Sequence, residues 1–84
     1  METCSFGEWM KTRRRALRLT QREVATAVFC FTAMVKKIEA DERYPSTELV
    51  YLLADTLEIP AEHHELFVEA ARGRLTYSAN GLNG

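Results

Sequence analysis

The sequence predicts an all-helical domain in which five short helices pack as an orthogonal bundle. Three observations support this fold class: apolar residues recur at helical spacing, capping residues precede the apolar runs, and the connections between the runs are short. The chain has 84 residues, which is enough for one domain near the lower size limit for burying a core. No segment shows the alternation that predicts a strand.

The first two predicted helices each begin at a capping box. Ser5 with Glu8 opens a helix from Phe6 to about Leu17, and Thr20 with Glu23 opens a helix from Gln21 to Val28. In such a pair the two side chains satisfy backbone N–H groups of the first turn. The residues expected on the inner faces are Phe6, Met10, Arg14 and Leu17 in the first helix, and Val24, Ala25 and Val28 in the second.

Three further helices follow. One runs from about Thr32 to Ala40 with Val35 and Ile38 inward, and the polar loop 41–45 ends it. Ser46 caps the next helix, whose predicted buried residues are Leu49, Leu52, Leu53 and Leu57. The last helix starts near Pro60 and continues through Leu66, Phe67 and Ala70 to Gly73. We therefore expect residues 1–73 to form the domain and residues 74–84 to form a polar, flexible tail.

Composition argues against several classes of function. No apolar run is long enough for a membrane span, and no signal peptide is expected. Cys4 and Cys30 lack metal or redox spacing, which favours free thiols in a cytoplasmic (or recombinant) protein. Adjacent His63 and His64 point about 100° apart on a helix, so surface histidines are expected rather than a metal site. Without a nucleophile–base pair or a phosphate loop, we expect neither an enzyme nor a cofactor.

The charge is distributed unevenly along the chain. The segment from Lys11 to Lys37 contains eight basic residues and one acidic residue, Glu23. After Arg43, acidic residues outnumber basic ones. This asymmetry is compatible with nucleic acid approaching the basic half. It is equally compatible with ordinary solvated helix faces, and charge alone does not decide between them.

Several motifs together resemble a known family. They are Leu-Thr-Gln-Arg-Glu-Val-Ala at 19–25, Lys-Ile-Glu-Ala-Asp-Glu-Arg at 37–43, Pro45-Ser46, and Leu-Leu-Ala-Asp at 52–55 with Leu-Glu-Ile-Pro at 57–60. They make residues 6–73 similar to the XRE family of lambda-repressor and Cro-like helix-turn-helix domains, in particular to domains that begin large bacterial regulators. The resemblance implies a lambda-repressor-like fold and a structural ion pair between Arg14 and Glu39.

The resemblance also implies DNA contacts. Members of the family place the helix after the turn in the major groove while the preceding helix crosses the phosphate backbone. By position, Gln21 would contact a phosphate or a base edge, and the loop near Arg43 and Tyr44 and the helix start at Thr47 would approach the backbone. The recognition face would consist of Phe31, Thr32, Ala33, Lys36 and Lys37.

The segment that should contact DNA departs from the family pattern. Phe29 stands where the family prefers a glycine with positive φ, a substitution that costs about 1 kcal/mol. Phe31 replaces the usual serine or threonine N-cap, at a similar cost of about 1 kcal/mol. Met34 stands where a small polar residue is common, and Tyr44, Val50 and Tyr51 add apolar surface.

Because Val24, Ala25, Val28, Val35 and Ile38 already fill the inward positions, we expect Phe29, Phe31 and Met34 to point outward. Exposed apolar patches usually mark protein interfaces. The first hypothesis is therefore a protein-binding module, in its sharpest form an engineered binder on a helix-turn-helix scaffold. Its interface comprises the anchors Phe29, Phe31 and Met34, the flank Tyr44, Val50 and Tyr51, and the rim residues Thr32, Lys36 and Thr47.

Three alternatives remain at this point. The chain could be a sequence-specific DNA-binding regulator domain that uses Gln21, Arg22, Thr32, Lys36, Lys37 and Arg43. The turn could instead be rebuilt so that the phenylalanines enlarge the core. A phenylalanine could also wedge between bases, as in minor-groove proteins. The sequence identifies neither the partner protein nor the oligomeric state.

Overall fold

In a computed structural model of the chain, the described residues are 3–73 and 77–78. They form five α-helices, so the predicted all-helical class is confirmed: α1 (Phe6–Ala16), α2 (Gln21–Ala27), α3 (Thr32–Glu39), α4 (Thr47–Thr56) and α5 (His64–Ala71). A 3-10 turn, η1 (Ala61–His63), leads into α5. Within the described ranges, no helix is long and apolar enough to cross a bilayer.

The expectation of no strands is wrong at two short segments. β1 (Thr3–Cys4) and β2 (Tyr77–Ser78) pair antiparallel, with Thr3 opposite Ser78 and Cys4 opposite Tyr77. Strands of two residues are too short to produce the alternation that sequence analysis detects. The flexible tail predicted for 74–84 otherwise falls on residues 74–76 and 79–84, which lie outside the described part of the chain.

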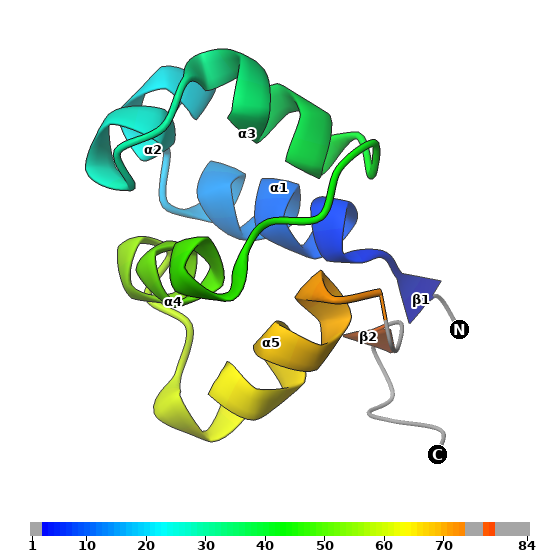
Figure 1. Cartoon of the computed structure of the whole chain (residues 1–84). Coiled ribbons are helices and arrows are strands. Elements are labelled where there is room, and N and C mark those ends of the chain that lie inside the picture. The colour runs from blue at the N-terminus through cyan, green and yellow to red at the C-terminus, as the bar shows by residue number, and fades with distance from the viewer. Residues whose placement is uncertain (1–2, 74–76, 79–84) are drawn as a thin grey trace.

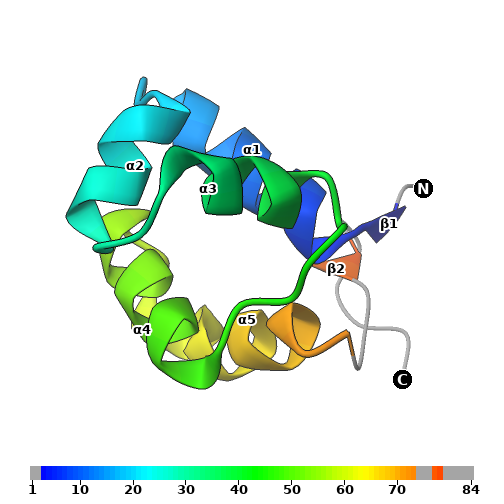
Figure 2. The same ribbon diagram turned by 45° about the horizontal axis from the view of Figure 1, so that its top comes forward.

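The helices lie in two groups around α1. Figures 1 and 2 show α2 and α3 on one side of α1 and α4 and α5 on the other, with the β1–β2 pair beside the start of α1. The connection between α2 and α3 lies at one end of the molecule, and the C-terminal end of α5 lies toward the opposite end.

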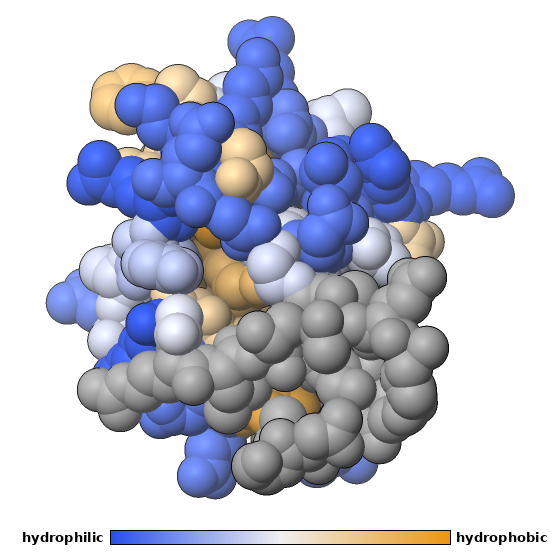
Figure 3. Space-filling model, turned by 90° about the vertical axis from the view of Figure 1, so that its right-hand side faces the viewer, coloured by the Kyte–Doolittle hydropathy of each residue, from blue (hydrophilic) through white to orange (hydrophobic). Residues whose placement is uncertain are grey.

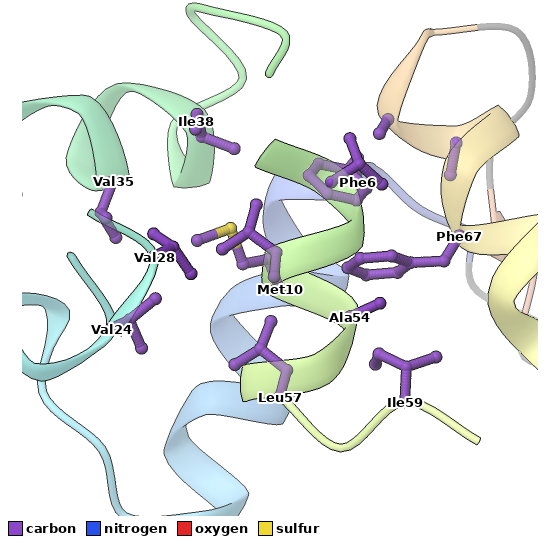
Figure 4. Close-up of a cluster of buried hydrophobic side chains, with 14 of the residues drawn as sticks. Phe6, Met10, Val24, Val28, Val35, Ile38, Ala54, Leu57, Ile59 and Phe67 are labelled. Carbon is purple, nitrogen blue, oxygen red and sulfur yellow. The ribbon is translucent and has the colours of Figure 1, made fainter. Parts of the chain in front are cut away.

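The core is a single cluster centred on Met10. Figure 4 shows side chains from all five helices converging on it, among them Val24, Ile38 and Leu57. The Phe67 ring lies between two aromatic partners, with its centroid 4.8 Å from that of Phe6 and 5.0 Å from that of Trp9. The inner residues predicted for α2 and α3 are all buried.

The predicted buried face of α4 is partly wrong. Leu52 is exposed and Leu49 only half-buried, while Val50 and Ala54 are buried with Leu53 and Leu57. The α4 sequence contains two overlapping apolar stripes at helical spacing, and the structure buries the stripe with the smaller residues. Val50 and Ala54 place little side-chain bulk between α4 and the rest of the core.

The helix starts follow the predicted caps with one difference. The Thr20–Glu23 capping box is present in full, and Ser46 accepts from the Leu49 N–H. Ser5 accepts from the Glu8 N–H at 3.1 Å, but no reciprocal bond from the Ser5 N–H to the Glu8 carboxylate is found here, so the box is incomplete; the Ser5 hydroxyl donates instead to Asp41.

Asp41 joins the end of α3 to the start of α1. Its carboxylate accepts from the Ser5 hydroxyl and from the Gly7 N–H, the latter at 2.9 Å. A Cβ at position 7 would lie 2.5–2.7 Å from the Asp41 carboxylate and from two backbone oxygens of α3. The N-terminus of α1 therefore approaches α3 as closely as it does only because residue 7 is glycine.

The helix ends share one geometry. Each α-helix is followed by a residue with positive φ, namely Arg18, Phe29, Asp41, Glu58 and Gly73. After the first four helices, two successive backbone N–H groups return to carbonyls of the last turn, which is the Schellman pattern. Only the fifth of these positions is glycine, so the backbone conformation of Phe29 is shared by three other non-glycine residues.

Candidate functional site

The α2–α3 pair is positioned by a buried ion pair. Arg14 Nε and Nη2 donate to the two Glu39 carboxylate oxygens at 2.7 and 3.1 Å, and the two side chains are only 11% and 2% exposed. Arg14 also donates to the Leu19 carbonyl, and the Gln21 amide donates to Glu39 at 3.0 Å. The pair expected from the family resemblance is therefore present, and it ties α1, α2 and α3 together.

Between α2 and α3, the chain passes through the turn that contains Phe29 and Phe31. Their side chains are 86% and 85% exposed. This exposure contradicts the alternative in which the two rings fold into an enlarged core. Phe29 has a φ of 60°, the conformation expected from the family resemblance, and Phe31 is the N-cap of α3 without a side-chain capping bond.

Met34 does not join the two phenylalanines on the surface. It is half-buried and packs against the core, because its position at the edge of the inner face of α3 turns it toward the bundle. Cys30, between the two phenylalanines, is likewise half-buried against the core, with its thiol 3.6 Å from the Phe31 carbonyl. Burial raises the pKa of this thiol.

The proposed flank of the apolar patch is not assembled around the turn. Val50 was expected at the surface but is 1% exposed, since it lies on the inner face of α4. Tyr44 is exposed, yet its ring lies against Gly73, at the end of α5. Thr47, expected on the rim, accepts a hydrogen bond from Arg72 beyond α5. Tyr51 is exposed on α4.

The outer face of α3 is small and cationic. Ala33, Lys36 and Lys37 are exposed at a spacing of three and four residues, which places them on one side of the helix, and Thr32 is half-buried beside them. Neither lysine contacts a carboxylate among the described residues. Figure 3 shows hydrophilic side chains over most of the upper part of the face in view, where α3 and the loop after it lie.

The other predicted DNA contacts divide into two groups. Arg22 in the first turn of α2 and Arg43 in the loop after α3 are exposed. Gln21 is half-buried and its amide is used by Glu39. Of the basic residues between 11 and 37, Arg13 and Arg14 are also used internally, Arg13 by donating to the Leu57 and Glu58 carbonyls at the end of α4.

The internal roles of Arg13, Asp41 and Gly7 were not predicted from the sequence. The only sequence signal was the identity of Gly7, a glycine within an otherwise favourable helix, which often indicates a close approach of another backbone.

The histidines and carboxylates of the described residues do not gather into a metal-ligand cluster. No group of three or more potential metal ligands is found among them. His63 is exposed, and His64 is half-buried with its Nε2 2.7 Å from the Ile59 carbonyl. His64 therefore connects the start of α5 to the end of the preceding loop instead of lying free on the surface.

Comparison with known proteins finds no match: no protein-family model fits the chain, and neither curated proteins nor solved structures include one of significant similarity.

Proposed function

We propose that the chain is a helix-turn-helix DNA-binding domain in which α2, the turn and α3 form the motif. The observation that carries the proposal is the outer face of α3, where Ala33, Lys36 and Lys37 are exposed. Glu39, the one acidic residue of α3, is buried and forms an ion pair with Arg14. A slim cationic helix face of this kind suits the major groove, which admits one α-helix.

The packing behind α3 supports the same function. Ala25 is buried where α2 and α3 meet, and the Arg14–Glu39–Gln21 network fixes α3 against α1 and α2. A recognition helix must be held rigidly, because base readout depends on side chains reaching base edges at defined positions. The XRE-like motifs of the sequence predict the same arrangement.

The charges also favour approach from the α2–α3 side. Arg22, Lys36, Lys37 and Arg43 are exposed on or next to these helices. From α4 to the end of α5 the chain carries Glu48, Asp55, Glu58, Glu62, Glu65 and Glu69. These six residues belong to α4, α5 and the turns after α4, on the other side of α1 from α3, while Glu23, Asp41 and Glu42 are the exposed acidic residues on the α2–α3 side.

Protein binding is the second candidate, and the exposure of Phe29 and Phe31 favours it. The engineered-binder form of this hypothesis needs a larger patch than these two rings. Met34 is half-buried against the core, Val50 is buried in it, and Tyr44 lies by the end of α5. The positive φ of Phe29 is also no evidence for an interface, since Arg18, Asp41 and Glu58 have it too. We therefore rank protein binding second.

Chemical-shift mapping with a mixed-sequence DNA duplex at low salt tests the proposal. The largest amide shifts are expected in the first turn of α2 and along α3, with small shifts in α4 and α5. Lys37→Ala should weaken binding, because it removes an exposed cation from the proposed face.

Arg15→Ala is the matched control, since it removes one exposed positive charge from the outer side of α1. It should weaken binding much less than Lys37→Ala does. Equal effects of the two substitutions would indicate nonspecific attraction and would contradict the assignment of α3. An absence of DNA binding at low salt would leave protein binding as the better candidate.

A further inference from the structure

We propose that the first turn of α3 recognises thymine through its C5 methyl group, with Phe31 and Ala33 as the contacting residues. The inference rests on the proposed DNA-binding function and adds its base preference. It would make Phe31, which breaks the usual capping rule, a residue that determines sequence specificity.

Phe31 lies at the start of α3, where a recognition helix meets the bases. In helix-turn-helix proteins, the N-terminal residues of the second helix contact base edges. Phe31 is the N-cap of α3, its ring is 85% exposed, and no capping bond ties its side chain to the helix. The ring is therefore free to reach into a groove that the start of α3 enters.

The exposed side chains of the first turn of α3 are apolar. Phe31 and Ala33 offer no side-chain hydrogen-bonding group, so they cannot pair with the donors and acceptors of a base edge. The thymine methyl is the one apolar group displayed in the major groove, and alanine and phenylalanine are among the residues that contact it. Phe31 and Ala33 are the exposed residues of this turn, while Thr32 between them is half-buried.

The second turn of α3 differs in chemistry. Lys36 and Lys37 lie three and four residues after Ala33, on the same face. Lysine donates to the O6 and N7 acceptors of guanine or to phosphate oxygens. The face therefore favours a site in which A·T pairs under the first turn are followed by a G·C pair or by the backbone under the second.

Replacing thymine by uracil tests the inference, because it removes the methyl group and keeps the base-pairing edge. Duplexes with a randomised segment are selected for binding in two pools, one made with thymine and one with uracil. The wild-type domain is expected to enrich a thymine-containing motif from the first pool. Substituting uracil in that motif should weaken binding about fourfold for each methyl contact.

Phe31→Ser is the matching variant. Serine is a favoured N-cap, so the variant is expected to fold and can be compared directly. It should bind the thymine and uracil forms of the motif with more nearly equal affinity. Phe29→Ser removes an equally exposed ring from the turn and should keep the preference for thymine.

The possible outcomes separate the two proposals. Equal wild-type affinity for both forms of a selected motif would overturn thymine recognition and leave DNA binding intact. Loss of the preference in Phe29→Ser, but not in Phe31→Ser, would overturn the assignment to Phe31. Failure to enrich any duplex, with no binding at low salt, would overturn the DNA-binding function itself.

Discussion

Two helix ends in this protein combine the same backbone conformation with opposite side-chain roles. Phe29 has a φ of 60° and Asp41 a φ of 61°. The Phe29 ring is exposed, whereas the Asp41 carboxylate accepts hydrogen bonds from Ser5 and Gly7. Substitution by glycine relieves a left-handed conformation at both positions, with a smaller gain at Asp41 because aspartate adopts it more readily than phenylalanine, and it removes tertiary contacts only at Asp41.

The expected magnitudes have opposite signs. A left-handed conformation costs a non-glycine residue about 1–2 kcal/mol, and the greater freedom of glycine in the unfolded chain offsets about 0.4–1 kcal/mol of the gain. Phe29→Gly should therefore stabilise the domain by about 0.5–1 kcal/mol. Asp41→Gly removes two hydrogen bonds to the carboxylate. Even at this exposed site, their loss outweighs the gain from relieving the left-handed backbone, so a net loss of stability of about 1–2 kcal/mol is expected.

Thermal unfolding followed by circular dichroism measures both changes. At about 4–8 °C per kcal/mol for a domain of this size, Phe29→Gly should raise the Tm by about 3–6 °C and Asp41→Gly should lower it by at least as much. Arg18→Gly, at a φ of 59°, is the control and should behave like Phe29→Gly. A lower Tm for Phe29→Gly would show that its ring packs in solution, and an unchanged Tm for Asp41→Gly would refute the role of its carboxylate.

Three further predictions concern the core and its surroundings. Gly7→Ala should lower the free energy of unfolding in urea by about 1–3 kcal/mol, because the added Cβ meets backbone oxygens, and a neutral result would contradict the close approach. Arg14→Ala should cost about 3 kcal/mol by the same assay because it leaves the 2% exposed Glu39 side chain without its cation, and a loss under 1 kcal/mol would refute this. In a Cys4→Ser background, iodoacetamide should alkylate Cys30 more slowly in the folded than in the urea-unfolded protein, since burial raises its pKa and lowers its thiolate fraction. Below the unfolded-state pKa of the Cys30 thiol, its contribution to the stability of the fold should be complete. That contribution should be lost as the pH rises through the raised folded-state pKa. Cys30→Ala should abolish this pH-dependent loss of stability.

The sequence predicted the inner residues of α2 and α3 because apolar spacing is a local pattern, whereas in the first helix Phe6 and Met10 are buried but Leu17 is only half-buried. The Thr20–Glu23 box marks the start of α2 without ambiguity, and Val35 and Ile38 leave α3 one possible inner face. The register of α4 was predicted wrongly because Leu52 and Val50 belong to competing stripes. Leucine is the larger residue, but Val50 is the side chain that packs in the core, and Leu52 is exposed.

The candidate site was predicted only in part, for reasons of tertiary structure. Exposure of Phe29 and Phe31 follows from inner positions that other residues already fill. The position of Tyr44 depends on where the end of α5 lies, which no local pattern encodes. The hydrogen bond that the Gly7 N–H donates to Asp41 likewise joins residues 34 positions apart, so spacing along the chain gives no indication of it.

The salt dependence of duplex binding tests the central claim most directly. Each phosphate neutralised by the protein contributes about −0.9 to the slope of log affinity against log salt. We expect steep salt dependence for the wild-type domain and a slope shallower by about 1 for Lys37→Ala, with no such change for Arg15→Ala. A salt-independent affinity, or a slope unaltered by Lys37→Ala, would contradict the claim that α3 carries the DNA-binding face.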